Sequence, residues 1–382
     1  MVLITLIIVL AIVLVADFYI WFNFIKGGKR IWSILHWLPA AGLLAMVFLS
    51  RTNLMWSSGM FRLLVFLLLT VAMAKCAFAL FSFIGKCLSA LLVSAPGVCN
   101  YLGLGAALVV ILSMGYGMTT GWKKVAVKQI DIVSESIPAT FEGYTIVQLS
   151  DIHIGTFAHN PEVVKKMVST VNGLQPDAIF FTGDLVNVSP DELKPFIPEL
   201  SAMSAPDGIY SILGNHDYCE YLPGIVIPEQ GLAELVQLEE NLGWTVLRNE
   251  HRMISRGDDC IAVIGVENDG EPPFPAHGDL VKASKGIPAD CYKILLSHNP
   301  THWKREILPD SDIQLTLSGH THAMQLKIGN FSPAQWRYPQ WGGLYEEGSR
   351  KLYVNTGLGG TVKFRLGVPG EITVIRLHPQ LQ

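Results

Sequence analysis

The segment Tyr144–His153, YTIVQLSDIH, decides the fold of this chain. It begins as a continuous apolar, β-branched run, which is typical of a strand buried on both faces. It ends in Asp151 and His153, and side chains two positions apart in an extended segment lie on the same side. A buried strand that delivers a carboxylate and an imidazole at its end predicts a ligand site at one edge of a sheet.

The same texture continues on both sides of this segment, from residue 125 to residue 378. Further buried strands are predicted from apolar runs at 178–182, 209–213, 260–266, 292–296 and 313–317. Helical patterns lie between the runs, one at Pro161–Leu174 with Asn160 as its N-cap, and one at Glu229–Leu242. Alternating strands and helices predict a layered α/β domain.

Polar clusters follow five of these strands. They comprise Asp151 with His153, Asp184, Asn215 with His216 and Asp217, His298, and His320 with His322. Carboxylate, imidazole and amide donors suit Mn²⁺, Fe or Zn²⁺, whereas a soft-metal or Fe–S centre needs thiolates, which these clusters lack. Ligand sites in open α/β sheets collect at the carboxyl ends of strands, so we expect these side chains to meet.

The clusters occur in the order Asp-x-His, Gly-Asp, Gly-Asn-His-Asp, a single His and Gly-His-x-His. In this order they resemble the calcineurin-like metallophosphoesterase superfamily, and more narrowly its bacterial membrane-anchored branch. The resemblance implies a four-layer α/β-β/α sandwich with a binuclear metal site at one edge. Many relatives continue the last motif with two glycines and a glutamine, whereas this chain has Ala323-Met324-Gln325. That bulkier rim prevents a substrate from being carried over from any relative.

The resemblance also implies a role for each residue of the clusters. One ion would be held by Asp151, His153 and His322, the other by Asn215, His298 and His320, and both by Asp184 as a bridge. His216 would lie over the phosphate as general acid or charge stabiliser, with Asp217 orienting it. A hydroxide bridging the two ions would then attack phosphorus in line. No Ser or Cys nucleophile stands in the clusters, so we expect no covalent enzyme intermediate.

Two features near the C-terminus leave alternatives open. Arg365 resembles the terminal pattern of the same branch, where it would either bind an anionic substrate or pair with an acid. The aromatic segment Trp336–Tyr345 either faces a membrane or lipid substrate or forms a buried structural loop.

Residues 1–121 predict an all-α transmembrane region, because a helix needs about 20 apolar residues to cross a bilayer. Four helices are expected at 2–22, 31–50, 63–84 and 101–120. Asp17 and Lys75 interrupt this apolar sequence and mark either a polar site within the membrane or a contact between helices. The chain is therefore expected to be a multi-pass protein of the cell (inner) membrane, with a catalytic domain over 125–378.

The side of the membrane follows less directly. Lys26, Lys29 and Arg30 lie between the first two helices, and no basic residue precedes the first helix. This favours an outside N-terminus and an extracytoplasmic catalytic domain, since basic loops stay in the cytoplasm. Basic residues in the other loops, such as Arg51 and Lys123, argue for the opposite orientation.

Composition excludes some classes of function. Half of the residues are hydrophobic and the net charge is −4, so no basic face for nucleic acid is expected. The six cysteines form no CxxC pair and are interpreted as small buried apolar side chains, which leaves the redox compartment open.

Three functions remain. The first is hydrolysis of a phosphodiester or pyrophosphate bond in a phosphorylated, membrane-associated and lipid-linked substrate. The second is the UDP-2,3-diacylglucosamine pyrophosphatase step of lipid A synthesis, which requires a cytoplasmic catalytic face. The third is a non-catalytic metal-binding sensor, but such relatives normally lose ligands and this chain retains the full set.

Overall fold

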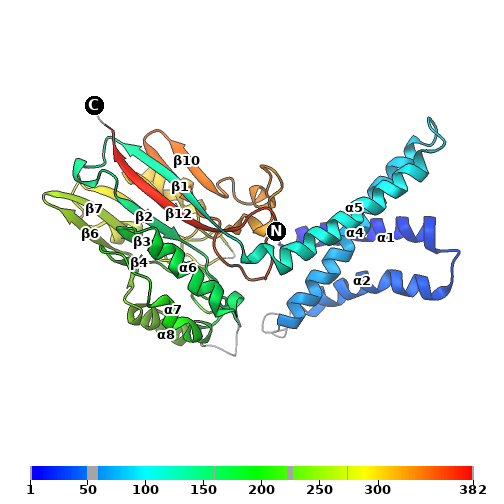
Figure 1. Ribbon diagram of the computed structural model, residues 1–382, viewed down its shortest axis with the longest axis horizontal. Coiled ribbons are helices and arrows are strands. Elements are labelled where there is room, and N and C mark those ends of the chain that lie inside the picture. Colours follow the sequence, from blue (N-terminus) through cyan, green and yellow to red (C-terminus); the bar gives the residue numbers. More distant parts are fainter. Residues whose placement is uncertain (1, 50–58, 159, 222–226, 273, 381–382) are drawn as a thin grey trace. The chain divides into compact units, whose positions relative to one another are not determined.

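The computed structural model describes residues 2–49, 59–158, 160–221, 227–272 and 274–380. The chain divides into two compact units, Met1–Gly117 and Met118–Gln382. Figure 1 shows helices in the first unit and two sheets flanked by helices in the second. The expected sequence of an all-helical region followed by an α/β domain is therefore confirmed.

The first unit consists of long apolar helices. They are α1 (Val2–Ile20), which continues through η1 (Trp21–Ile25), α2 (Arg30–Leu49), α4 (Gly59–Leu88) and α5 (Ala95–Thr119). Within the described residues, two stretches are long and apolar enough to cross a membrane, Phe66–Leu88 and Ala95–Lys123, and Leu10–Ile25 is a shorter apolar helix. The expected helix at 31–50 matches α2, except that residue 50 lies outside the described part of the chain.

Asp17 and Lys75 bind each other across two helices of this unit. The Lys75 ammonium donates to Asp17 Oδ1 at 2.7 Å and to the carbonyl oxygen of His36 at 2.6 Å. The contact joins α1, α2 and α4, and the Asp17 carboxylate is buried. A charge in an apolar helix bundle is stabilised when it is paired in this way. The geometry favours the helix-contact interpretation of these two residues.

The second unit holds two six-stranded sheets. The first has the order β1 (Val125–Ser134), β12 (Gly370–Pro379), β2 (Thr145–Leu149), β3 (Ala178–Phe181), β4 (Ile209–Ser211), β5 (Thr245–Val246). The second has the order β10 (Gly343–Glu347), β11 (Arg350–Val354), β9 (Leu315–Ser318), β8 (Tyr292–Leu296), β7 (Asp259–Gly265), β6 (Glu250–Arg256). Strands β2 to β5 are parallel, and so are β7, β8, β9 and β11.

Three apolar clusters define four layers. Between the sheets, Ile146 and Phe180 of the first sheet pack with Val263 and Ile294 of the second. On the outer face of the first sheet lie α6 (Pro161–Gly173) and α8 (Pro228–Asn241), together with the short α7 (Ile197–Leu200). On the outer face of the second lie α9 (Leu280–Ser284), η7 (Trp303–Ile307) and α10 (Leu308–Asp310). This is the expected α/β-β/α sandwich.

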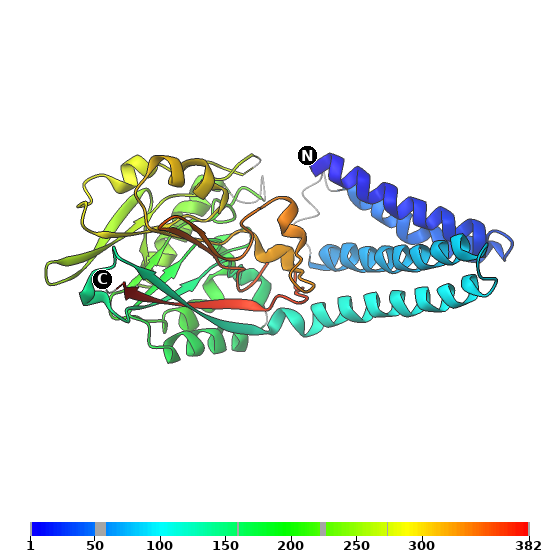
Figure 2. The same cartoon turned by 90° about the horizontal axis from the view of Figure 1, so that it is seen from above.

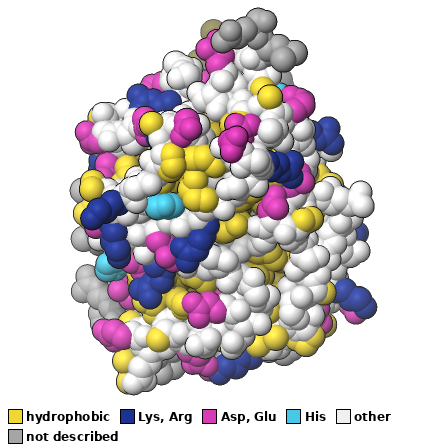
Figure 3. All heavy atoms as spheres, turned by 90° about the vertical axis from the view of Figure 1, so that its left-hand side faces the viewer, with side chains coloured by type: hydrophobic (Ala, Val, Ile, Leu, Met, Phe, Trp, Pro, Cys, Tyr) yellow, Lys and Arg dark blue, Asp and Glu magenta, His cyan; other side chains and the backbone are white. Residues whose placement is uncertain are grey.

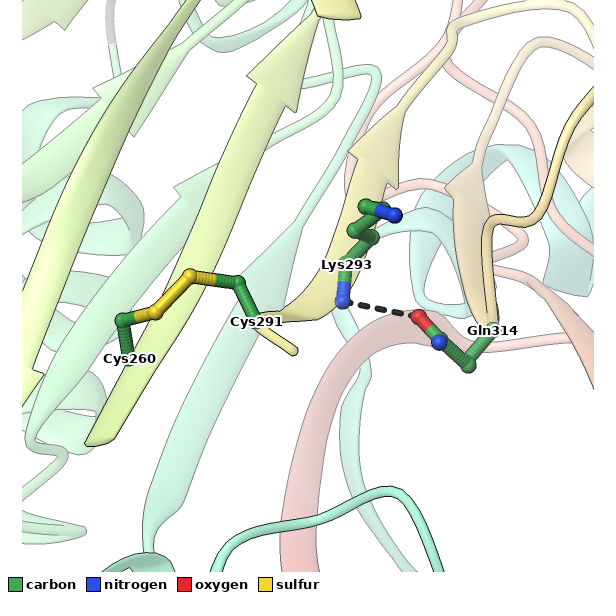
Figure 4. The surroundings of a disulfide bond; sticks show 4 residues. All are labelled: Cys260, Cys291, Lys293 and Gln314. Atoms are coloured by element: carbon green, nitrogen blue, oxygen red, sulfur yellow. Dashed lines mark hydrogen bonds between the residues drawn. A yellow bond between two sulfur atoms is a disulfide. The ribbon is translucent and has the colours of Figure 1, made fainter. Parts of the chain in front are cut away.

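A disulfide joins Cys260 of β7 to Cys291, which directly precedes β8 (Figure 4). Just beyond it, the backbone N–H of Lys293 donates to Gln314 Oε1 at 2.8 Å and so ties β8 to the residue before β9. The interpretation of these two cysteines as plain apolar side chains is therefore corrected. Their parallel strands are neighbours in the sheet, which brings the two α-carbons to 5.0 Å.

Acidic and basic side chains are interspersed on the face of the molecule in Figure 3. Ion pairs of this kind in the second unit include Arg256 with Asp177 at 3.3 Å.

Candidate metal centre

The carboxyl ends of β2, β3, β4, β8 and β9 bring the predicted ligands together. Four side chains form the first group: Asp151, His153, Asp184 and His322. His322 Nε2 lies 3.2 Å from both His153 Nε2 and Asp151 Oδ1. All four donor atoms lie within 4.8 Å of one another, which is the spacing of ligands around a single cation.

A second group shares one residue with the first. Asp184 Oδ2 lies 3.2 Å from His298 Nε2 and 3.4 Å from His153 Nε2. His298 Nε2 in turn lies 3.2 Å from His320 Nδ1. Asp184 thus stands between the two groups, with one carboxylate oxygen turned to imidazoles of both.

Asn215 adds a donor that fits a metal ion. Its amide Nδ2 donates to the Tyr221 hydroxyl at 2.8 Å, while its Oδ1 is buried without a hydrogen-bond partner among the described residues. The backbone N–H of His216, the next residue, donates to Asp184 Oδ1 at 2.9 Å. A buried carbonyl oxygen without a partner costs stability, and a cation would remove that cost.

The backbone around the centre is unusual. Five of the predicted ligands, Asp151, His153, Asp184, His320 and His322, have φ between 44° and 71°. Non-glycine residues rarely adopt this left-handed conformation, which costs about 1–3 kcal/mol at each position. Strain of this kind persists where the surrounding fold holds it and is concentrated at functional sites.

Gly214 permits the closest approach of two motifs. A Cβ atom at this position would lie 2.2 Å from Asp184 Oδ1 and 2.7 Å from the His298 ring. The glycine of the Gly-Asn-His-Asp motif is therefore required by packing against the shared carboxylate, not by its own φ.

Contacts from residues outside the two groups orient the imidazole rings of His298 and His320. His298 Nδ1–H donates to the Thr182 carbonyl at 2.7 Å, which turns Nε2 into the centre. His320 Nε2 contacts the Tyr338 hydroxyl at 2.8 Å, which leaves Nδ1 for the centre. The ring of Phe274 packs edge-on against His320 at 4.6 Å. Contacts of this type orient metal ligands and set their tautomer.

The charge states of these groups suit a cation. Burial raises the pKa of a carboxylate, but His298 and its neighbours outweigh this and hold the pKa of Asp184 well below its usual value. Burial lowers the pKa of His320 and of His322 well below the usual value, so both rings are neutral. Burial also opposes protonation of His298, yet Asp184 raises its pKa to about 9, and an incoming cation would replace that proton.

His216 lies beside the first group and outside both. Its ring packs against His153 at 4.7 Å and against Tyr221 at 4.4 Å. Its Nδ1–H donates to the Asn187 carbonyl at 2.6 Å, so Nε2 is the nitrogen left for a substrate. Burial lowers the pKa of His216 to about 4, although Asp184 opposes this shift.

Two predicted site residues have other contacts. Asp217 accepts hydrogen bonds from the backbone N–H groups of four residues and does not orient His216, whose ring is held by Asn187 instead. The donors to Asp217 are Asp184, Leu185, Val186 and Gly214, at 2.7 to 3.2 Å. Arg365 is buried, and its guanidinium donates to carbonyl oxygens that include those of Thr356, Gly357 and Gly359. Among the described residues it forms no ion pair with an acid, and contact with an anionic substrate stays a prediction.

Sequence reasoning missed Tyr221, Tyr338 and Phe274. Tyr338 belongs to the aromatic segment that was singled out, but no spacing rule connects it to His320. The contact depends on the path of the chain between residues 322 and 338.

Comparison with known proteins agrees with this geometry. The profile of the family described as "Calcineurin-like phosphoesterase" matches residues 144–324, and that of "Probable Calcineurin-like phosphoesterase, transmembrane domain" matches residues 3–122. An uncharacterized metallophosphoesterase of Bacillus subtilis, YkuE, is 34% identical over 64% of this chain and 83% of its own. A zebrafish (Danio rerio) "Transmembrane protein with metallophosphoesterase domain" is 30% identical over 96% of this chain and 87% of its own. The UDP-2,3-diacylglucosamine pyrophosphatase LpxG of Chlamydia trachomatis is 27% identical over 62% of this chain and 84% of its own.

Proposed function

This chain belongs to the calcineurin-like phosphoesterase family, and from that premise we propose that it hydrolyses a phosphodiester or pyrophosphate bond of a membrane-associated substrate with two divalent ions. The chain is a metallophosphoesterase and a membrane protein whose Asp and His clusters suit divalent metals. The observation that carries the proposal is the position of Asp184 between two groups of ligands.

The proposed ligand sets follow the two groups. Asp151, His153 and His322 would hold one ion, Asn215, His298 and His320 would hold the other, and Asp184 would be available to both. Two such ions would bind and polarise phosphate oxygens and supply an activated water. A donor set of carboxylate and amide oxygens with imidazole nitrogens is compatible with Mn²⁺, Fe or Zn²⁺.

His216 is proposed to act on the substrate through Nε2. The Asn187 carbonyl holds the opposite nitrogen, so the ring cannot rotate without losing that bond. With a pKa of about 4 the ring is neutral near pH 7, and the negative charge of a bound phosphate would favour its protonation. Its proton would then pass to the leaving oxygen.

We further propose that the catalytic unit lies outside the cytoplasm, in an oxidising compartment. The disulfide between Cys260 and Cys291 supports this side, because disulfides persist in such compartments and are rare in the cytosol. The balance of loop charges left the side open, and the disulfide is an independent argument. The cytoplasmic lipid A step is the alternative, which the likeness to LpxG and the basic residues of the other loops support.

The test uses full-length protein in detergent, freed of metal and reloaded with Mn²⁺. We expect hydrolysis of bis(p-nitrophenyl) phosphate, and a loss of turnover of about 10²-fold or more in Asn215→Ala and in His216→Ala. His378→Ala, which changes a histidine on the surface of the same unit, is the matched control. Full turnover in the first two variants would overturn the proposed site.

Two further measurements separate the alternatives. Release of UMP from UDP-2,3-diacylglucosamine would assign the lipid A step, and its absence beside diester hydrolysis would leave the leading proposal. Gel-shift labelling of thiols in intact cells would find Cys260 and Cys291 blocked if the unit lies in an oxidising compartment. Free thiols at both positions would contradict that side.

A further inference from the structure

The segment between the last metal motif and β10 exposes large apolar side chains. Trp336 is 80% exposed and Ile328 is 67% exposed, with Met324 and Phe331 also exposed. The rings of Phe331 and Trp336 pack together at 5.5 Å, and a backbone bridge holds Ile328 beside Phe331. We call Met324, Ile328, Phe331 and Trp336 the rim surface. Contiguous exposed apolar surface beside a site marks a binding face.

The rim surface adjoins the metal centre at both of its ends. The segment leaves the centre at His322 through a left-handed turn that includes Met324. It returns at Tyr338, whose hydroxyl contacts His320 Nε2. Ser332 Oγ donates to the Ala323 carbonyl at 2.7 Å and closes the loop on itself. The segment that carries the rim surface is therefore tied to the centre on both sides.

Residues 362–366 form a short strip of chain between the rim surface and Trp122, which lies near the beginning of the second unit. Lys327 N–H donates to the Leu366 carbonyl at 2.8 Å, and the Gln325 amide donates to the Val362 carbonyl at 3.0 Å. Lys363, in the same strip, lies over the ring of Trp122 at 5.4 Å. Figures 1 and 2 both place this part of the chain beside the beginning of β1.

Trp122 lies close to the end of the apolar helix α5. It is buried in the core of the second unit, only three positions after α5 ends at Thr119. The apolar stretch that contains α5 runs to Lys123. Only a few residues separate the end of the apolar helix from Trp122, so the strip at residues 362–366 lies within a few residues' length of the end of that helix.

The composition around the rim surface favours a bilayer over a protein partner. Trp and Phe are enriched at the interface between membrane and water, where Lys and Arg bind anionic headgroups. Lys327 lies over the ring of Trp341 at 5.7 Å, and Lys123 and Lys124 follow the apolar helix directly. An apolar surface flanked by lysines is typical of a segment that lies in the headgroup layer.

We propose that the rim surface inserts into the headgroup layer of the bilayer, and that the metal centre thereby acts on phosphoesters of lipids that remain in the membrane. The second half of this statement rests on the proposed function. The first half concerns only the membrane contact and is tested without catalysis.

The membrane contact is tested by fluorescence quenching. Full-length protein and its Trp336→Phe variant are reconstituted in vesicles of phosphatidylcholine and phosphatidylglycerol, with and without brominated acyl chains. The fluorescence that the substitution removes belongs to Trp336, and we expect brominated lipid to quench most of it. If bromine leaves this difference unchanged, Trp336 does not contact lipid and the proposal fails.

The link to substrate is tested with two diesters that share a leaving group. One is soluble bis(p-nitrophenyl) phosphate, and the other is the p-nitrophenyl ester of phosphatidic acid in the same vesicles. Ile328→Asp should lower the ratio of vesicle to soluble turnover about tenfold, because a charge opposes insertion. Val281→Asp is the matched control, since Val281 is 80% exposed in α9 of the same unit.

The two outcomes are distinguishable. An unchanged ratio in Ile328→Asp overturns the delivery of membrane lipids to the centre. If the unmodified protein hydrolyses neither diester and releases no UMP from UDP-2,3-diacylglucosamine, the proposed function fails, while the quenching measurement still decides the membrane contact.

Discussion

The amide nitrogen of Asn215 donates to the hydroxyl of Tyr221 at 2.8 Å, and this one hydrogen bond determines which end of the Asn215 side chain faces the metal centre. The oxygen left over is buried and has no partner among the described residues. Tyr221 also packs its ring against His216 at 4.4 Å. One tyrosine thus contacts a proposed ligand and the proposed proton donor.

Tyr221→Phe should weaken metal binding at the Asn215 site. The variant keeps the ring against His216 but removes the hydroxyl that orients the amide, and losses of this kind cost about 10–100-fold in affinity or activity. Metal content after dialysis and turnover at saturating Mn²⁺ are the measurements. Excess metal should restore part of the activity of Tyr221→Phe but less of that of Tyr221→Ala, which also loses the ring contact. Equal behaviour of both variants and the unmodified protein would contradict the positioning role.

Asp217→Asn should destabilise the catalytic unit. The carboxylate accepts four backbone N–H groups, whereas an amide presents one oxygen and an N–H₂ group that faces other donors. Each amide left without an acceptor costs about 1–3 kcal/mol. Thermal unfolding in detergent should show the loss, together with lower activity because Asp184 and Gly214 are held by this side chain. Asp191→Asn, on the surface, is the control and should leave the unfolding temperature unchanged.

Glu239→Gln should make the protein more stable than the unmodified protein at high pH. Glu239 in α8 is buried, and its Oε2 accepts a hydrogen bond from Ser211 at 2.6 Å. Burial raises its pKa well above the usual 4.5, so the folded state keeps a proton that the unfolded state releases. Stability therefore falls with pH from about 4.5 up to the folded pKa.

The glutamine variant lacks this ionisation and should lose that part of the pH dependence. Unfolding temperatures at pH 5 and pH 8 measure the difference, with Glu240→Gln, the exposed neighbour, as control. A variant that follows the same pH profile as the unmodified protein would show that Glu239 is not protonated in the fold.

Loss of the disulfide should destabilise the second sheet. Cys260 and Cys291 are 31 residues apart, and a loop of that size corresponds to about 3–4 kcal/mol of chain entropy. The double variant Cys260→Ala, Cys291→Ala should unfold at lower temperature, and reductant should bring the unmodified protein to the same value. Cys219→Ala, a buried thiol in no disulfide, controls for reductant effects. An unfolding temperature that does not respond to reductant would contradict the bond.

The sequence predicted the parts of the fold that are local. The apolar runs that became β3, β8 and β9 could be found because each ends in a polar motif, and that of β7 because it is continuous and β-branched. The α6 and α8 helices matched their periodic patterns within a residue or two at each end. The predicted metal-centre residues lie close together because strand ends meet at one edge of parallel sheets.

The remainder depends on contacts between distant parts of the chain. β1 pairs with β12 in parallel from Val125 with Gly370 to Ser134 with Pro379, and no local pattern announces a partner so far along the chain. Arg365 resembled a substrate contact because its chemistry fits one, but its burial is a tertiary fact. The same reason applies to His216, whose ring we expected Asp217 to orient. The Asn187 carbonyl accepts its hydrogen bond instead, because the loop after β3 brings that oxygen to the ring.

The left-handed backbone at the metal centre affects which substitutions at the site are tolerated in evolution. Replacing His322 or Asp184 by glycine would relieve strain in the backbone while it removes a ligand. At His322, whose Nδ1 has no hydrogen-bond partner among the described residues, such a glycine variant should thus suffer little penalty in folding, and selection for a stable protein alone would let it accumulate. Purifying selection on turnover itself is what holds such residues in place, and a lineage that no longer needed the reaction would lose them first.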